Sequence, residues 1–211
     1  MEKVAKAQKL CHEVLSMIIP DLKVSQDHAL IEERMTQGKS LKKLGDEKMK
    51  RSELRPALLD FTYAALRFYQ AAVAMAKQES FGRARSLLEQ TGRYAVGCAS
   101  ANKQSEVQLS RALLYYVAAV CFGKAFSVSA ASTRRDHKKL SELVKENKGS
   151  EADPQQLKVV VETTDNVYKA LEWYHYAVKL AGTQLELPSN VLLQTESELM
   201  DCVDKAVNAI K

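Results

Sequence analysis

Apolar side chains dominate one stretch of the chain, from Arg111 to Thr133, and leave it without a polar face. Lys124 is the only charged residue between Arg111 and Arg134. A surface helix has one apolar stripe and one polar side, whereas the aliphatic and aromatic residues here point in every direction around a period of 3.6 residues. The pattern therefore predicts a central helix, at about 106–132, that other helices surround.

The same periodicity predicts helices along the rest of the chain, and no stretch shows the alternation of a strand. The expected fold is all-α, with about eight helices in a helical-repeat-like, tetratricopeptide-like bundle around the buried central helix. At 211 residues the chain fits one domain, 1–211, with 1–40 as a candidate N-terminal extension and 148–153 as a loop. The expected helices are 2–19, 27–51, 56–77 (with 52 as an alternative start), 81–101, 106–132, 133–147, 154–181 and 195–210.

Local signals define several of these helix ends. Ser80 and Ser105 are suitable N-cap residues for the helices that follow them. Gly182 is expected at the C′ position after the seventh helix, where a left-handed backbone favours glycine. Thr195 and Glu198 form a T-x-x-E capping box at the start of the last helix.

Two helices differ in how their apolar residues are arranged. Helix 27–51 is the most polar, and Gly38 and Gly45 each weaken it by about 1 kcal/mol relative to Ala, so we expect it to lie outside or to bend. Helix 154–181 has a regular apolar face that we expect to pack into the core, with His175 as a packing residue. That face comprises Leu157, Val160, Val161, Thr164, Val167, Tyr168, Leu171, Tyr174, His175 and Val178.

The charge and the cysteine content of the chain indicate which partners and which cellular compartment are compatible with it. The net charge of +5 permits acidic or nucleic-acid partners without requiring them. The cysteines Cys11, Cys98, Cys121 and Cys202 are far apart and form no C-x-x-C pair, which argues against zinc and redox motifs. Cys98 and Cys121 have apolar neighbours, as small buried hydrophobes do, and unpaired cysteines are typical of the cytosol or nucleus.

Membrane-spanning and enzymatic functions are both disfavoured. The central stretch is long enough to cross a bilayer, but Lys124 at its middle and the serines that follow argue against a span. The sequence contains no glycine-rich phosphate loop with Lys, no H-E-x-x-H and no G-x-S-x-G. We therefore expect no catalytic residues, no metal, no cofactor, no small-molecule substrate and no membrane contact.

An aromatic cluster is the first candidate for binding. Trp173, Tyr174 and Tyr176, together with Leu180, place bulky side chains on two sides of their predicted helix. One interpretation is burial between two layers of the domain. The other is a protein interface, where Trp and Tyr are enriched as anchors.

A basic cluster is the second candidate. Arg134, Arg135, Lys138 and Lys139 form the densest positive group in the chain. They fit either the solvated start of a helix or a contact with phosphate or an acidic partner. No aromatic residues lie among them, so stacking on single-stranded bases is not expected there.

Short motifs spread over residues 40–211 match a known pattern. An R-D-H run, Arg135 to His137, follows the central helix as it does in that pattern. The other matching segments are LKKLGDEKMK (41–50), ALLDFTYAALRFYQAAVAM (57–75), SRALLYYVAAVCFGKAFSV (110–128), the helix at 157–180 and SELMDCVDKAVNAI (197–210). Together they resemble the C-terminal homology domain of the AFF family of transcription elongation scaffold proteins. Plant proteins with a CW-type zinc finger carry a similar helical domain.

The resemblance implies a nuclear protein that forms homodimers, or heterodimers with a paralogue, in a scaffold such as the super elongation complex. It also implies that contact of the basic cluster with nucleic acid is worth testing. Two alternatives stay open. One is a stand-alone helical-repeat adaptor, of the tetratricopeptide or microtubule-interacting-and-trafficking type, that binds a partner peptide in a groove. The other is a weak nucleic-acid-binding module.

Overall fold

The structure is a computed structural model of the chain. It describes residues 28–145, 154–192 and 194–210, without the side chains of 131–145, 155, 156 and 159. The expected helix 2–19 and the expected loop 148–153 lie outside the described residues.

The described residues form α-helices and one 3-10 turn, with no strand among them, which confirms the all-α prediction. They contain six α-helices rather than the seven expected in this part of the chain, because two expected helices are joined. The elements are α2 (His28–Lys50), α3 (Leu54–Lys77), α4 (Phe81–Ala101), η2 (Ser105–Val107), α5 (Gln108–Lys145), α6 (Pro154–Ala181) and α7 (Glu196–Ile210).

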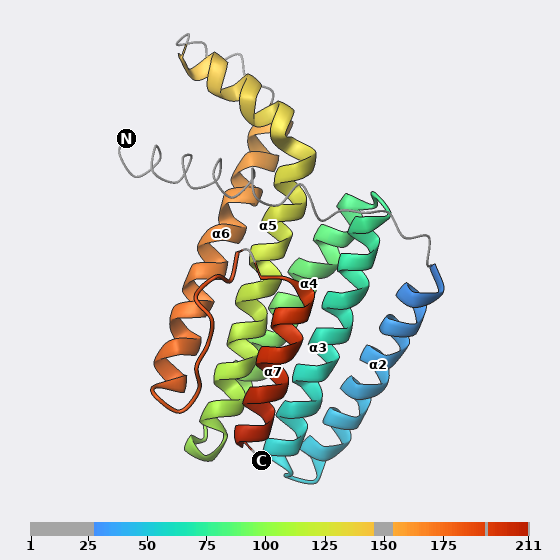
Figure 1. Cartoon of the computed structure of the whole chain (residues 1–211), viewed down its shortest axis with the longest axis vertical. Helices are drawn as coiled ribbons and strands as arrows, with labels where there is room; N and C mark the ends of the chain where they lie inside the picture. Colours follow the sequence, from blue (N-terminus) through green and yellow to red (C-terminus); the bar gives the residue numbers. More distant parts are fainter. Residues whose placement is uncertain (1–27, 146–153, 193, 211) are drawn as a thin grey trace.

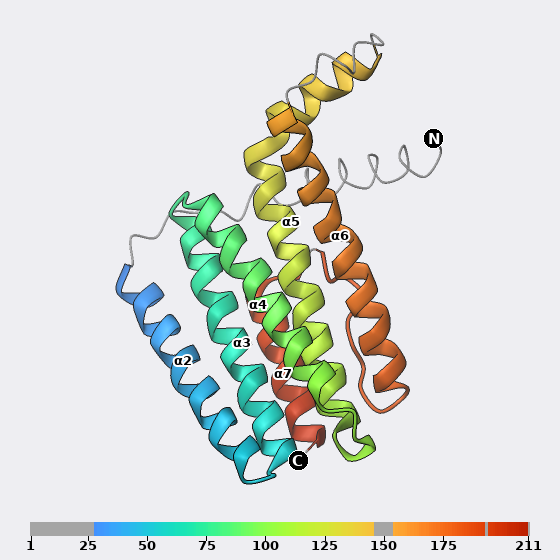
Figure 2. The same cartoon turned by 180° about the vertical axis from the view of Figure 1, so that it is seen from behind.

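Each helix from α2 to α6 packs beside the next one in the sequence, so the bundle is a row of antiparallel neighbours (Figure 1). Helices α2 and α6 lie at the two ends of this row. After α6 the chain runs back along the bundle, and α7 then packs against α3 and α5 (Figure 2). Helix α3 contacts α2, α4, α5 and α7.

Helix α5 is the buried centre of the bundle, as the sequence predicts. Tyr116, Phe122 and Phe126 are each 2% exposed or less. The segment Ser105–Ala130 is long and apolar enough to cross a membrane, but 94% of its most apolar window is buried inside the protein. The apolar surface of this helix is therefore covered by its own neighbouring helices.

The expected helices 106–132 and 133–147 are one continuous helix, α5, of 38 residues. No glycine or proline lies between Lys124 and Asn147, so nothing in the backbone ends the helix near Ser132. Ser105 is not the N-cap of this helix, because it begins the short turn η2, and α5 begins at Gln108. The last part of α5 extends past the ends of α3 and α4 (Figure 1).

Helix-end signals were correct at two of the other three positions. Gly182 follows α6 with a left-handed φ of 56°. The backbone N–H of Thr195 donates to Glu198 Oε2 at 2.8 Å, and the N–H of Glu198 donates to Thr195 Oγ1 at 3.3 Å, which forms the predicted capping box. Ser80 precedes α4 but its side chain makes no capping hydrogen bond.

Helix α2 lies on the outside of the bundle, as expected, and its glycines allow close packing on α3. Gly38 and Gly45 are its only buried residues. A Cβ at Gly38 would lie 2.6 Å from Phe68 Cε1, and one at Gly45 would lie 2.6 Å from Phe61 Cδ1. The glycines therefore leave room for two phenylalanine rings, at the expense of helix propensity.

Candidate functional site

Helix α6 packs on α5 through small and polar residues rather than through its large apolar ones. Among the side chains of α6 that the structure describes, the fully buried ones are Thr163, Asn166, Ala170, Ala177 and Ala181. Alanine has no side chain beyond Cβ, so it lets two helix axes approach closely. The prediction that the regular apolar face of this helix packs into the core is therefore wrong, because much of that face is exposed.

An exposed apolar stripe runs along the side of α6 that faces away from the core. Val161 is 65% exposed, Tyr168 61% and Leu171 45%. Members of the stripe recur at alternating intervals of four and three residues, which is the heptad spacing of a helix that pairs with another helix. We call this surface the outer stripe; its residues are Leu157, Val161, Thr164, Tyr168, Leu171, His175 and Val178.

Strong exposure of large hydrophobic residues is concentrated on α6. Seven such residues are exposed within the described part of the chain; Leu44 is on α2, and the other six are on α6. Those six present on the order of 500 Å² of apolar surface, as large as the biggest patch on many monomers. Single exposed hydrophobic residues are ordinary, whereas this much exposed apolar surface on one helix is typical of an interaction surface.

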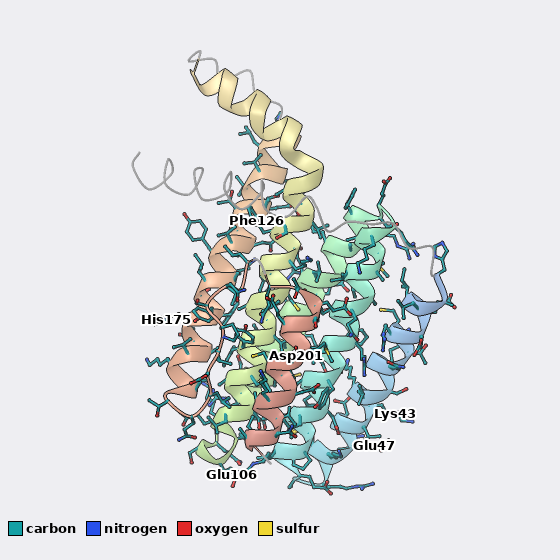
Figure 3. The ribbon with its side chains drawn as sticks, in the orientation of Figure 1. Lys43, Glu47, Glu106, Phe126, His175 and Asp201 are labelled. Atoms are coloured by element: carbon teal, nitrogen blue, oxygen red, sulfur yellow. The ribbon has the colours of Figure 1, made fainter. Side chains whose placement is uncertain are left out.

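Charged residues follow one edge of the outer stripe. Lys158, Asp165, Glu172 and Lys179 are exposed and occupy the heptad position next to the seam, where charges influence the choice of partner. His175 is also exposed, at the edge of the bundle (Figure 3). It lies in the outer stripe and is not the core packing residue that the sequence predicted.

A network of charged and amide groups fixes α6 to α4. Arg85 Nε donates to Glu89 Oε1 at 2.8 Å, and Arg85 also pairs with Glu162 of α6. Asn166 Nδ2 donates to Glu89 Oε1 at 2.9 Å. Burial raises the pKa of Glu89, but the hydrogen bonds from Arg85 and Asn166 outweigh burial, so the pKa lies below its ordinary value of 4.5. The outer stripe is thus displayed on a helix that is anchored on its other side.

All four residues predicted as an interface contact their own domain. Trp173 stacks on Tyr115 of α5, with ring centroids 5.3 Å apart. Tyr174 and Leu180 are partly buried against the core. Tyr176 is 48% exposed, and its ring centroid lies 6.0 Å from that of Tyr115 and 5.6 Å from that of Trp173. An interface role for these residues stays a prediction, and Tyr176 is the one whose exposure favours it.

The basic cluster lies on the part of α5 that extends beyond the bundle (Figure 2). The side chains of Arg134, Arg135, Lys138 and Lys139 lie outside the described residues. Their contact with nucleic acid stays a prediction. The helical backbone at these positions places the four residues within about one and a half turns of one another.

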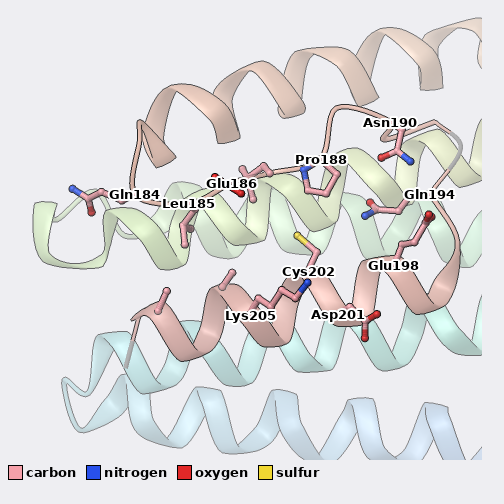
Figure 4. Close-up of a pocket in the computed structure, with 13 residues that line it drawn as sticks. Gln184, Leu185, Glu186, Pro188, Asn190, Gln194, Glu198, Asp201, Cys202 and Lys205 are labelled. Carbon is pink, nitrogen blue, oxygen red and sulfur yellow. The ribbon is translucent and has the colours of Figure 1, made fainter.

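A groove of about 600 Å³ lies between the irregular segment 184–190 and α7 (Figure 4). Leu185, Cys202 and Ala206 are buried and contribute apolar lining. Gln194 lies at one end of the groove (Figure 4). We call this surface the α7 groove.

No three His, Cys, Asp or Glu side chains come together as a metal site within the described residues. Cys98, Cys121 and Cys202 are free thiols. Cys121 is fully buried, as predicted, and Cys98 is partly buried. Burial raises the pKa of all three thiols, that of Cys98 to about 11. A raised pKa lowers the fraction of reactive thiolate.

Periodicity alone assigned the outer stripe to the core, because a regular apolar face indicates that something covers it and not what covers it. The alanines on the opposite side, Ala170, Ala177 and Ala181, are the signal that could have identified the packed face. No protein-family model, curated protein or solved structure matches this chain.

Proposed function

We propose that this protein is a non-enzymatic interaction module that dimerises through the outer stripe of α6. The partner is a second copy of the chain or a paralogue. The observation that carries the proposal is the heptad-spaced exposure of Leu157, Val161, Tyr168, Leu171 and Val178 on one helix face. A helix with this pattern is stable against another helix with a matching seam.

The size of the outer stripe agrees with a dimer of moderate stability. Two copies would bury on the order of 1,000 Å² from their exposed apolar side chains alone, close to the lower limit for specific interfaces. Flanking residues add to this area. Because α6 is already held by α4 and α5, little order has to be gained on binding, which lowers the entropic cost of association.

The wider role that we propose rests on the resemblance to the C-terminal homology domain of the AFF proteins. It assigns the chain to a nuclear scaffold that gathers transcription elongation factors. The packing of each helix on the next one in sequence supports a repeat-like description of the bundle. In such a scaffold, dimerisation joins two sets of bound factors without any catalytic step by this chain.

Light scattering behind a sizing column tests the dimer directly. The absolute mass is measured over a hundredfold range of concentration, beginning near ~1 μM, where a dimer of moderate affinity dissociates. We expect a mass that rises toward twice 23.5 kDa as concentration increases. A constant mass of 23.5 kDa at all concentrations would exclude homodimerisation, and mixing with a paralogue would then test the heterodimer.

A further inference from the structure

The amide of Gln194 is the feature that indicates a second binding site, in the α7 groove and independent of the outer stripe. Gln194 is 3% exposed, and its Oε1 accepts a hydrogen bond from the Tyr116 hydroxyl at 2.6 Å. Tyr116 is fully buried, so this bond fixes the orientation of the amide. The Nε2 group can only donate, and it has no acceptor among the described residues. Figure 4 shows the amide directed into the groove.

A buried donor without an acceptor destabilises the protein. A ligand that supplies an acceptor removes this cost and therefore binds more tightly. The groove is large enough for such a ligand, because about 600 Å³ lies within the range of small-molecule and short-peptide sites. Gln194 itself lines the groove, so a ligand bound there lies beside its amide.

The backbone of the same segment offers further partners. From Leu185 to Asn190, no backbone group pairs with another backbone group of the described residues. The Leu187 carbonyl accepts only a long bond, 3.5 Å, from the Tyr174 hydroxyl. An extended peptide can satisfy a row of such groups with its own N–H and C=O groups, as peptides do when they add to an exposed backbone edge.

The charge of the groove selects among peptides. Glu186 and Asp201 line it, and neither carboxylate makes a hydrogen bond or ion pair with another described residue. Glu198 is already engaged by Thr195. Among the described residues that line the groove, Lys205 is the only basic one. The free carboxylates therefore favour a ligand that carries a positive charge.

We propose that the α7 groove binds an extended segment of a partner protein that contains a lysine or arginine. A backbone carbonyl of this segment accepts a hydrogen bond from Gln194 Nε2. Its basic side chain pairs with Glu186 or Asp201, and its apolar side chains cover Leu185 and Ala206. This site does not depend on dimerisation through α6.

Nuclear magnetic resonance of the full ¹⁵N-labelled chain tests the proposal. Two degenerate mixtures of capped heptapeptides are added at up to about 1 mM, the range of weak peptide binding. One mixture has arginine fixed at the centre and the other has glutamate. We expect the arginine mixture to shift the Gln194 side-chain amide and the backbone amides of 185–190, and the glutamate mixture to leave them unchanged.

Matched variants assign the effect to the groove. Gln194→Glu replaces the donor with an acceptor of the same shape and should weaken binding about tenfold or more. The matched control Gln104→Glu, on an exposed residue outside the groove, should leave binding within about twofold. If Gln194→Glu fails to fold, the exposed pair Glu186→Gln and Asp201→Asn takes its place and should abolish the preference for arginine.

Three results would overturn the proposal. They are the absence of shifts with the arginine mixture, equal shifts with both mixtures, and undiminished binding by a folded Gln194→Glu variant. The same titration on Leu171→Asp separates this site from the outer stripe, since that change affects dimerisation and should leave peptide binding unaltered.

Discussion

The indole of Trp173 lies parallel to the ring of Tyr115, with the two planes 4° apart. The stack joins α6 to α5 on the side away from the outer stripe, so Trp173 contributes to the stability of a single chain. We predict that Trp173→Ala lowers the free energy of unfolding by about 3 kcal/mol. Tyr176→Ala should lower it by about 1 kcal/mol, because that ring is 48% exposed. Urea denaturation at low protein concentration measures both values; equal losses would contradict this assignment.

The outer stripe predicts a clear difference between two leucines of similar exposure. Leu171 is 45% exposed on α6, and Leu44 is 47% exposed on α2. Leu171→Asp places a charge in the proposed seam and should raise the dissociation constant of the dimer about a hundredfold or more. Leu44→Asp is the matched control and should leave the mass unchanged. Light scattering on both variants shows whether the outer stripe is the dimer interface. A Leu171→Asp variant that stays dimeric would place the interface elsewhere.

Two mid-helix glycines should respond to alanine with opposite signs. Gly45 lies against the buried ring of Phe61, so Gly45→Ala should destabilise the protein by about 1–2 kcal/mol despite the better helix propensity. Gly97 has nothing within 4 Å of the added Cβ, so Gly97→Ala should stabilise it by about 0.5–1 kcal/mol. Thermal denaturation of both variants and of the unchanged protein measures the two changes in stability. A stabilising Gly45→Ala would show that Phe61 moves aside without loss.

The lowered pKa of Glu89 predicts how stability depends on pH. A carboxyl whose pKa is lower in the folded chain contributes stability above its unfolded pKa, and this contribution is lost as pH falls through the folded value. Stability should therefore fall below about pH 4.5. Glu89→Gln should cost about 1 kcal/mol at pH 7 after allowance for solvent screening. It should also make the free energy of unfolding fall less steeply as the pH is lowered below about 4.5. Glu172→Gln, an exposed control on α6, should leave this pH dependence unchanged.

Helix positions were largely predictable from local chemistry. Helices α4 and α6 begin and end where the periodicity places them. The end of α6 at Gly182 and the capping box of Thr195 and Glu198 at the start of α7 were predictable because they depend on backbone angles and short-range hydrogen bonds. The buried centre of α5 was equally predictable, since a helix that is apolar all round must be covered. Its length was not predictable, because the change from apolar to charged sequence near Ser132 resembles an end without supplying a residue that stops a helix.

The roles of the two faces of α6 could not be obtained from periodicity. Trp173 lies about 200° round the helix from Leu171, which correctly places the two side chains on opposite sides. The choice of the Leu171 side as the packed one was wrong. Both sides carry large residues, and which side meets α5 depends on the shape of α5. The α7 groove could not be predicted from the sequence either. It forms between an irregular segment and a helix, and no local sequence pattern encodes how these two are placed relative to each other.

Helix α7 is the element whose contacts join the most distant parts of the sequence. Gln70 Nε2 donates to Glu196 Oε1, and the Tyr63 hydroxyl donates to Asp204 Oδ1. These pairs are 126 and 141 residues apart, whereas most contacts of the other helices are with their neighbours in sequence. Contacts at long separation require a larger loss of chain entropy and form slowly. We therefore expect α2 to α6 to pack against one another in sequence order during folding, and α7 to dock onto α3 and α5 last.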